Sequence, residues 1–385
     1  MPRRELPAPA RNPQPDAERI AAIRLIRSEN VGPVTFRDLL SHYGSARTAL
    51  EALPELSRRG GRRQPIRICP QSEAEAEISR AERFGAELIL VGDPDYPPPL
   101  AALDAPPPLL YAKGDTSLLQ KPTIAIVGSR QCSAAGAKLA RLFATEIGRA
   151  GFVVASGLAR GIDAAAHQAA ISTGTIAVLA GGIDHVYPPE HDTLQQAVGE
   201  RGCLLSEMPF GFIPRGQDFP RRNRIVSGLS LGVLIIEAAR RSGTLVTARL
   251  AAEQGREVFA VPGHPLDPRA EGTNKLLKSG ATFVTEPADI LSALSPQLNV
   301  PAPQLREEPL ATRHVTTPPS DDDRGRVLSA LGPAPVDIDS LARATGLPIR
   351  SVQIAVMELA LAGRLERHGG LISSSTPGGD LYPGP

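Results

Sequence analysis

The hydrophobic pattern between residues 123 and 290 consists of short apolar runs that alternate with segments of helical periodicity. The first run, 124–127 (IAIV), ends at Gly128 and is followed by a helix-periodic segment over 133–147. Further runs of this kind cover 152–156, 175–180, 203–207, 233–238, 257–263 and 282–285, and two strand-like runs precede them at 87–91 and 109–114. Strands without polar alternation are buried on both faces of a sheet. The repeat therefore predicts an α/β domain over 86–294, an extended Rossmann-like fold with a doubly wound parallel sheet.

Helical spacing of a different kind precedes this sheet, over residues 16–85. An apolar face starts at Ile20, a turn contains Gly32, and a second helix passes through Phe36. The pattern is similar to a SAM-like or helix-hairpin-helix module. Hairpins that bind DNA offer backbone N–H groups at a glycine-bearing turn, whereas Pro33 removes one donor here and no second glycine follows. A packing role is favoured, and contact with DNA stays open.

The C-terminal part of the chain predicts a second helical domain. Helical patterns over 324–331, 337–345 and 348–362, followed by a hairpin-like stretch, are typical of a winged helix over 321–373. Its third helix offers Arg350, Gln353 and Glu358 beside its apolar stripe, and residues 321–372 hold 6 Arg against 7 Asp and Glu. A helix that reads a DNA groove needs an excess of basic and amide groups. A protein-contact or regulatory role is therefore favoured over groove reading.

The remaining segments predict no packed structure. Residues 1–15 and 374–385 are expected to be tails, and the proline-rich stretch 295–320 to be a linker, because none of them shows periodicity. The basic stretch 58–67 (RRGGRRQPIR) is either a solvated connector or a contact to nucleic acid.

Composition excludes several classes of protein. The chain has 385 residues, of which 42% are hydrophobic, and no apolar run approaches the ~18 residues of a membrane span. Without a signal-like hydrophobic segment, a cytoplasmic protein with no membrane partner is expected. The three cysteines are far apart, so no disulfide framework or zinc site is predicted. The formal net charge is only +1, so any preference for a polyanion has to come from the distribution of charge.

That distribution places arginines beyond the carboxyl ends of the predicted strands, where open α/β sheets bind their ligands. Arg130 follows the first strand, Arg160 follows the second, and residues 221–224 (RRNR) begin a helix after the fourth. Helix starts and arginines both favour anions, so a groove for phosphates is predicted. The predicted binding residues are Gly128, Ser129, Arg130, Ser156, Gly157, Arg160, Gly161, Arg221, Arg222, Asn223, Arg224, Gly243 and Thr244.

Two enzymatic interpretations compete with simple binding. A dinucleotide fingerprint needs glycines where Arg130 and Ser133 stand, and a Walker A loop is also missing from the sequence. The stretch ARRSGTLVTA is similar to the P-G-G-x-G-T-x-x-E motif of nucleotide 5′-monophosphate phosphoribohydrolases, in which the glutamate supports cleavage. Gly243 and Thr244 match it, but Thr247 replaces the glutamate and supplies no carboxylate. The hydrolase is a disfavoured alternative, and no catalytic residue, metal or cofactor is predicted.

A family resemblance rests on motifs in a fixed order: IAIVGSR, SGLARGIDAAAH, LAGGIDHVYPPEH, LLSEMPFG, FPRRNRIVSGLS, IIEAARRSGTLVTA, VFAVPG and GTNKLLKSGA. Over residues 86–290 the chain resembles the DprA/Smf DNA-processing family. The resemblance implies a non-enzymatic, homodimeric protein that binds single-stranded DNA, protects incoming strands in natural transformation and loads RecA recombinase. It implies that Arg130 and Arg160 contact the DNA. We expect strand phosphates to lie on the N–H groups of the Gly128 and Gly157 turns, with weak sequence preference because aromatic residues make up only 4% of the chain.

Overall fold

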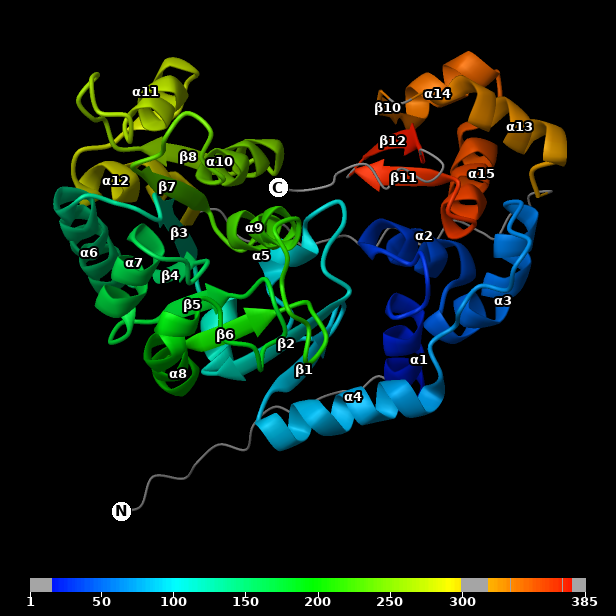
Figure 1. Ribbon diagram of the computed structural model, residues 1–385, viewed down its shortest axis with the longest axis horizontal. Coiled ribbons are helices and arrows are strands. Elements are labelled where there is room, and N and C mark those ends of the chain that lie inside the picture. Colours follow the sequence, from blue (N-terminus) through cyan, green and yellow to red (C-terminus); the bar gives the residue numbers. More distant parts are fainter. Residues whose placement is uncertain (1–15, 299–317, 333, 369, 376–385) are drawn as a thin grey trace, which may run out of the picture. The chain divides into compact units, whose positions relative to one another are not determined.

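The computed structural model describes residues 16–298, 318–332, 334–368 and 370–375. The chain divides into two compact units. Unit 1 combines residues from 1–76, 104–108 and 306–385, and unit 2 combines residues from 77–103 and 109–305 (Figure 1). The described parts of the chain contain no helix long and apolar enough to cross a membrane and no cluster of three or more candidate metal ligands.

Unit 2 is built around one sheet, which has nine strands within the described residues, in the order β1-β2-β6-β5-β4-β3-β7-β8-β9. The strands are β1 (Glu87–Leu90), β2 (Leu109–Gly114), β3 (Thr123–Gly128), β4 (Val153–Ser156), β5 (Thr175–Val178), β6 (Cys203–Ser206), β7 (Gly232–Ile236), β8 (Glu257–Ala260) and β9 (Thr282–Phe283). Strands β3 to β9 pair in parallel, and β2 joins β6 in the antiparallel direction. The predicted fold class is confirmed, and β1 and β2 form the extension of its sheet.

Side chains along β3 show how both faces of the sheet are covered. Ile124 and Ile126 pack in the cluster that includes Phe143 of α6 (Ala134–Arg149), whereas Ala125 and Val127 pack in the opposite cluster with α9 (Asp218–Gly228) and α10 (Thr244–Glu253). Alternate residues of a strand point to opposite faces, so a continuous apolar run serves two layers of helices. The helices of unit 2 are α4 (Gln71–Phe84, which starts in unit 1), α5 (Pro98–Ala101), α6 (Ala134–Arg149), α7 (Ile162–Ala170), α8 (Asp192–Arg201), α9 (Asp218–Gly228), α10 (Thr244–Glu253), α11 (Glu271–Lys278) and α12 (Pro287–Leu298), with short 3₁₀ turns at Thr116–Gln120 and Pro189–His191.

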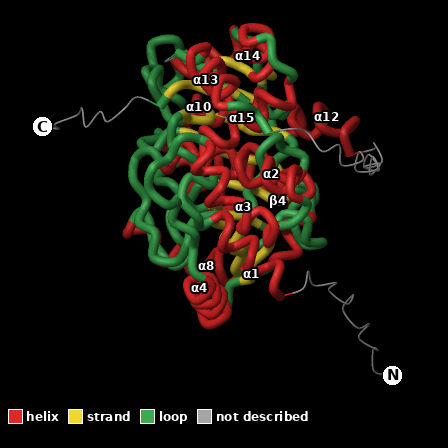
Figure 2. Tube along the Cα trace, turned by 90° about the vertical axis from the view of Figure 1, so that its right-hand side faces the viewer, coloured by secondary structure: helices red, strands yellow, loops and turns green. Residues whose placement is uncertain are grey.

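Unit 1 consists mainly of helices (Figure 2). Its N-terminal part contains α1 (Asp16–Ile26), α2 (Pro33–Tyr43) and α3 (Ala46–Arg59). Its C-terminal part contains α13 (Asp321–Ala330), α14 (Ile338–Thr345) and α15 (Ile349–Leu361), with a small sheet of β10 (Val336–Asp337), β12 (Leu371–Ser374) and β11 (Leu365–His368). Local signals set the ends: Ser45 caps α3, and Ser320 and Asp323 form a capping box at α13. The predicted helices and hairpin of the winged helix are confirmed.

The structure describes only the two ends of the predicted linker 295–320. Helix α12 continues to Leu298 and therefore includes its first four residues, and Ser320, its last residue, is the N-cap of α13. Residues 299–317 of the linker, the predicted tail 1–15 and residues 376–385 lie outside the described residues. Ser374, the first residue of the predicted C-terminal tail, is the last residue of β12.

Candidate nucleic-acid interface

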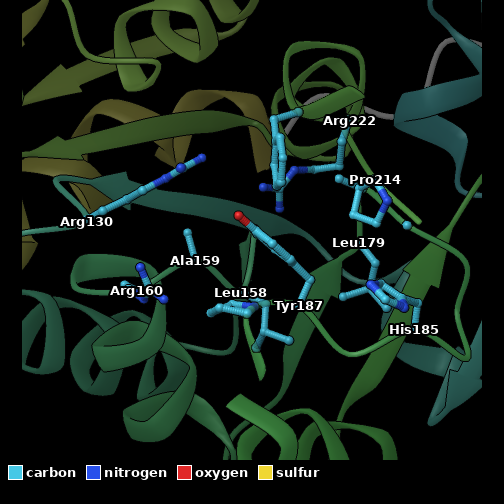
Figure 3. Close-up of a pocket in the computed structure, with 14 residues that line it drawn as sticks. Arg130, Leu158, Ala159, Arg160, Leu179, His185, Tyr187, Pro214 and Arg222 are labelled. Carbon is cyan, nitrogen blue, oxygen red and sulfur yellow. The ribbon is translucent and has the colours of Figure 1, made fainter. Parts of the chain in front are cut away.

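A pocket opens at the carboxyl ends of β3, β4 and β5, next to the start of α9 (Figure 3). Four of the predicted residues line it, namely Arg130, Gly157, Arg160 and Arg222. The other lining residues are Leu158, Ala159, Leu179, Ala180, Gly181, His185, Tyr187, Pro188, Pro214 and Phe219. No carboxylate is among these lining residues, so no side chain of the pocket wall carries a negative charge at neutral pH.

Arg130 is the exposed cation of this pocket. Its guanidinium lies 5.3 Å from the centre of the Phe219 ring, a cation–π distance. Within the described part of the chain, no carboxylate forms an ion pair with it. Figure 3 shows the tips of Arg130, Tyr187 and Arg222 pointing toward one another. A phosphate that enters here meets a guanidinium with its donors available.

Arg222 forms the floor of the pocket. Its side chain is 5% exposed and its Nη1 donates a hydrogen bond to the Val178 carbonyl at 2.6 Å. Burial lowers the pKa of Arg222 to about 10, against the opposing effect of the Asp163 carboxylate, so the guanidinium stays charged at neutral pH. A Cβ on Gly157 would lie 1.9 Å from Arg222 Nη1, which explains the glycine at that position.

Two backbone amides of the turn that begins at Gly157 are already used by the chain. Asp163 is buried, and its Oδ2 accepts hydrogen bonds from the amides of Gly157 at 3.1 Å and Ala159 at 3.3 Å. Burial raises the pKa of Asp163, and the nearby Arg222 charge opposes this effect. The Gly157 amide therefore already has an internal acceptor, and the expectation that strand phosphates lie on the N–H groups of the Gly128 and Gly157 turns stays a prediction.

The start of α6 is occupied in the same way. Glu237, which follows β7 with a left-handed φ of 53°, accepts hydrogen bonds from the amide of Ser133 at 2.8 Å and from the Ser133 hydroxyl. Ser133 Oγ in turn accepts from the Gly136 amide at 2.9 Å. In the turn after β3, the Gln131 amide donates to Ser129 Oγ at 3.2 Å. The helix N-terminus that the sequence offered to a phosphate is neutralised by a carboxylate of the same chain.

The glycines of the predicted site permit close approach of backbones. A Cβ on Gly128 would lie 1.9 Å from the Ile236 carbonyl oxygen, and one on Gly161 would lie 2.3 Å from the Ser129 carbonyl oxygen. Gly161 also has a φ of 75°, so both the positive φ and the close approach of another backbone favour glycine at this position. These contacts fix the turn that carries Arg130 against the start of α7.

Most of the basic stretch 221–224 is turned away from the pocket. Glu207 is 6% exposed and pairs with Arg221 at 3.0 Å between Nε and Oε1, and also with Arg224. Only Arg222 of the stretch lines the pocket, so the four residues do not form one open phosphate clamp. The remaining predicted residues, which do not line the pocket, are Gly128, Ser129, Ser156, Gly161, Arg221, Asn223, Arg224, Gly243 and Thr244.

Arg160 lines the pocket but has an acidic partner. It pairs with Glu190 from the 3₁₀ turn, and the two side chains are 60% and 47% exposed. The pair raises the pKa of Arg160 and lowers that of Glu190. Ion pairs at such exposure contribute little, so a phosphate can displace this carboxylate.

The sequence identified the aromatic wall of the pocket only by residue type. The rings of Tyr187 and Phe219 lie 5.2 Å apart with an interplanar angle of 50°, and Tyr187 is 43% exposed. The motifs LAGGIDHVYPPEH and FPRRNRIVSGLS contain Tyr187 and Phe219, which made both rings candidates for stacking beside the arginines. The structure brings both rings to the pocket, and His185 and Pro214 complete the wall.

Fold and site together define a class of protein. It has an extended Rossmann-like domain whose sheet edge carries arginines and aromatic rings, and it also has a helical N-terminal module and a winged helix. The chain belongs to the DNA recombination-mediator protein A family, whose model matches residues 87–295. The DprA-like N-terminal HHH domain matches residues 16–80, and the DprA winged helix domain matches residues 311–370. The resemblance seen in the motifs is confirmed.

Relatives extend over most of the chain. Protein Smf of Escherichia coli is 40% identical over 301 residues, which cover 76% of this chain and 79% of that protein. DNA processing protein DprA of Bacillus subtilis is 44% identical over 219 residues, or 56% of this chain and 73% of that protein. Among solved structures, DprA of Streptococcus pneumoniae has a TM-score of 0.60 at 36% identity and covers 71% of this chain and 96% of its own. DprA of Helicobacter pylori, described for its single-stranded DNA binding mode, has a TM-score of 0.51 at 31% identity, with coverage of 55% and 96%.

Proposed function

We propose that this protein binds single-stranded DNA along the carboxyl edge of its parallel sheet, with Arg130 as the principal phosphate contact. The observation that carries the proposal is the Arg130 guanidinium, which is exposed, has no ion-pair partner within the described residues and lies over Phe219 at the mouth of the pocket. The single-stranded DNA binding described for the H. pylori relative supports the choice of ligand.

In this proposal, side chains replace the backbone amides that the sequence suggested. Arg130 and Arg160 neutralise successive phosphates, and the buried Arg222 adds a fixed positive charge beneath them. The exposed ring of Tyr187 offers a surface on which one base stacks. Because stacking tolerates every base and the arginines meet only phosphate, binding has weak sequence preference.

The test is the affinity for labelled oligo-dT, measured by fluorescence anisotropy over a range of salt concentrations. With three to five phosphates neutralised, the log–log slope of affinity against salt is about −2 to −4, and Arg130→Ala reduces its magnitude by about 0.7. We expect this variant to bind roughly tenfold more weakly. Arg149→Ala, which removes an exposed arginine that pairs with Glu146 on α6, is the matched control and keeps the wild-type affinity. An Arg130→Ala protein with wild-type affinity and slope would falsify the proposal.

The proposal includes binding without turnover. The hydrolase alternative needs a carboxylate where Thr247 stands, and Thr247 is 3% exposed on α10 and does not line the pocket. The residues that do line it include no carboxylate that could act as an acid or base. Incubation with AMP and related nucleotides is expected to release no free base, and release above that of a heat-treated sample would overturn this part of the proposal.

Membership of the family supports a cellular role as well. We propose that the protein protects incoming single strands during natural transformation, loads RecA recombinase onto them and acts as a homodimer. The protein is expected to protect oligo-dT from a single-strand nuclease and to speed RecA assembly on a strand covered by single-strand-binding protein. Sedimentation is expected to give twice the chain mass. A monomeric protein that fails in both assays contradicts this role but leaves DNA binding at the pocket intact.

A further inference from the structure

Helix α15, the third helix of the winged helix, buries two faces. One face, with Val352, Val356 and Leu359, belongs to the core cluster of the winged helix. The second face contains Ile354, Met357, Glu358 and Leu361, which are 8%, 2%, 0% and 0% exposed although they are outside that cluster. These positions follow the spacing i, i+3, i+4, i+7 and therefore form one continuous stripe. A helix buried on a second stripe is covered by something other than its own domain.

The N-terminal helical module covers this second stripe. Helix α15 contacts both α2 and α3 within unit 1 (Figure 1). The end of α3 is closest, because a Cβ on its C-cap residue Gly60 would lie 2.1 Å from the Glu358 carbonyl oxygen and 2.8 Å from the Ala362 Cβ. Only a residue without a side chain allows the two backbones to approach this closely.

Polar contacts hold the same two modules together at the end of α15. Asn30, in the turn between α1 and α2, donates from Nδ2 to the Leu361 carbonyl at 3.1 Å. Arg367 of β11 pairs with Asp38 of α2 at 2.6 Å, and these side chains are 10% and 25% exposed. A partly buried pair of this kind joins residues 329 positions apart in the chain. The pair fixes how the two modules are oriented where the apolar stripe of α15 meets the N-terminal module.

The charge on the covered stripe is balanced within the winged helix. Glu358 Oε2 accepts from Nε of Arg324 on α13 at 2.7 Å, and the two side chains are 0% and 9% exposed. A buried carboxylate without such a partner would oppose contact with another apolar surface. With the partner in place, the stripe presents Ile354, Met357 and Leu361 as its contact surface.

We propose that the winged helix is a docking module, that its partner is the N-terminal helical module of the same chain, and that α15 is the docking surface. A winged helix that reads DNA inserts this third helix into the major groove, which needs the helix to be free along its outer face. Here the outer face is buried from Ile354 to Leu361, and the exposed residues of α15, Ile349, Arg350 and Gln353, all lie near its start. The terminal modules therefore act as one body, and α15 does not read duplex DNA.

The test uses charge reversal in the full-length protein, followed by hydrogen exchange. Asp38→Arg and Arg367→Asp each place like charges at the docking contact and are expected to speed amide exchange in residues 354–361 about tenfold. The double variant restores the opposite charges in reversed order and returns exchange to the wild-type rate. Arg343→Asp, on exposed α14 where Arg343 donates to Ser340 Oγ, is the matched control and leaves these amides unchanged.

Two results overturn the proposal. One is wild-type exchange in both single variants, or faster exchange that the double variant does not restore. The other comes from the exposed start of α15: Arg350→Ala with Gln353→Ala is expected to leave the affinity for a labelled duplex unchanged, and a loss of more than threefold would assign α15 to DNA after all. Neither the exchange measurement nor the duplex measurement changes a residue of the pocket at Arg130.

Discussion

Gly161 lies between the turn that carries Arg130 and the start of α7, so we expect Gly161→Ala to disturb the site without removing a charge. Its φ of 75° and ψ of −118° belong to a region that residues with a Cβ avoid, at a cost of about 1–2 kcal/mol. The new Cβ would lie 2.3 Å from the Ser129 carbonyl oxygen and 2.9 Å from that of Arg130. Ordinary contact needs about 1 Å more, and the movement breaks the 3.2 Å hydrogen bond from the Ile162 amide to Ser129, which contributes about 1 kcal/mol.

Together these effects lower the free energy of unfolding of unit 2 by about 2–4 kcal/mol, because neither partner oxygen belongs to a side chain that can rotate away. Urea denaturation followed by circular dichroism measures the change. Gly243→Ala is the matched control: its φ is −59° and a Cβ there meets no atom within 4 Å. The control is expected to be as stable as wild type or slightly more stable. A Gly161→Ala protein within 0.5 kcal/mol of wild type, about the error of such a comparison, would show that the two turns are not held together as described.

Two further predictions concern Tyr187 of the pocket and Glu190, the partner of Arg160, and a third concerns His167, which is buried on α7. Tyr187→Ala removes the exposed stacking ring and is expected to weaken oligo-dT binding by about 1–3 kcal/mol in anisotropy, whereas unchanged affinity would mean that no base stacks there. Glu190→Ala frees Arg160 and is expected to tighten the same binding about threefold, in line with an exposed pair of roughly 0.2–1 kcal/mol; weaker binding would contradict competition between carboxylate and phosphate. Burial lowers the pKa of His167 to about 3, so below its ordinary value of 6.5 the unfolded chain binds a proton that the folded protein does not, and stability falls as the pH drops. Between pH 7 and 5 the wild type is expected to lose about 2 kcal/mol more than His167→Asn in urea denaturation, and equal losses would refute the assignment.

The sequence was informative wherever local physics decides the structure. The apolar run 124–127 predicted β3, and Ser133 lies at the N-cap of α6, where its hydroxyl accepts from the Gly136 amide. The switch from continuous apolar runs to helical spacing also predicted the doubly wound sheet. These signals depend on neighbours a few residues apart, so one chain without relatives is enough to show them.

The carboxylates that accept hydrogen bonds at the helix starts could not be predicted from such local signals. Glu237 reaches Ser133 across 104 residues, and it does so only because β3 and β7 are neighbours in the sheet. Asp163 belongs to the motif SGLARGIDAAAH, and its acceptance of a hydrogen bond from the Gly157 amide depends on the folded loop. A motif shows that a carboxylate is near in sequence but does not show which amide it occupies.

In the winged helix, the sequence shows the apolar stripes of α15 but does not show which domain covers each of them. The stripe through Val352, Val356 and Leu359 is visible in the sequence and forms the core. The second stripe through Met357 and Leu361 has the same spacing, but a helix that is apolar on most sides gives no sign of which domain covers which side. The slight excess of acidic residues in the module, 7 Asp and Glu against 6 Arg over 321–372, agrees with the docking role inferred from its contacts.

The carboxylates at the two helix starts affect which phosphate compounds compete for this protein. A free nucleotide or inorganic phosphate usually depends on backbone amides at a helix N-terminus, and here Asp163 and Glu237 already accept from the amides of Gly157, Ala159 and Ser133. In the proposed function, what remains is a row of separate guanidinium groups, each of which would hold a single phosphate weakly. A polymer would gain from simultaneous contacts along that row, since every contact after the first is intramolecular. The internal carboxylates would then favour chains of phosphates over single small anions at this edge of the sheet.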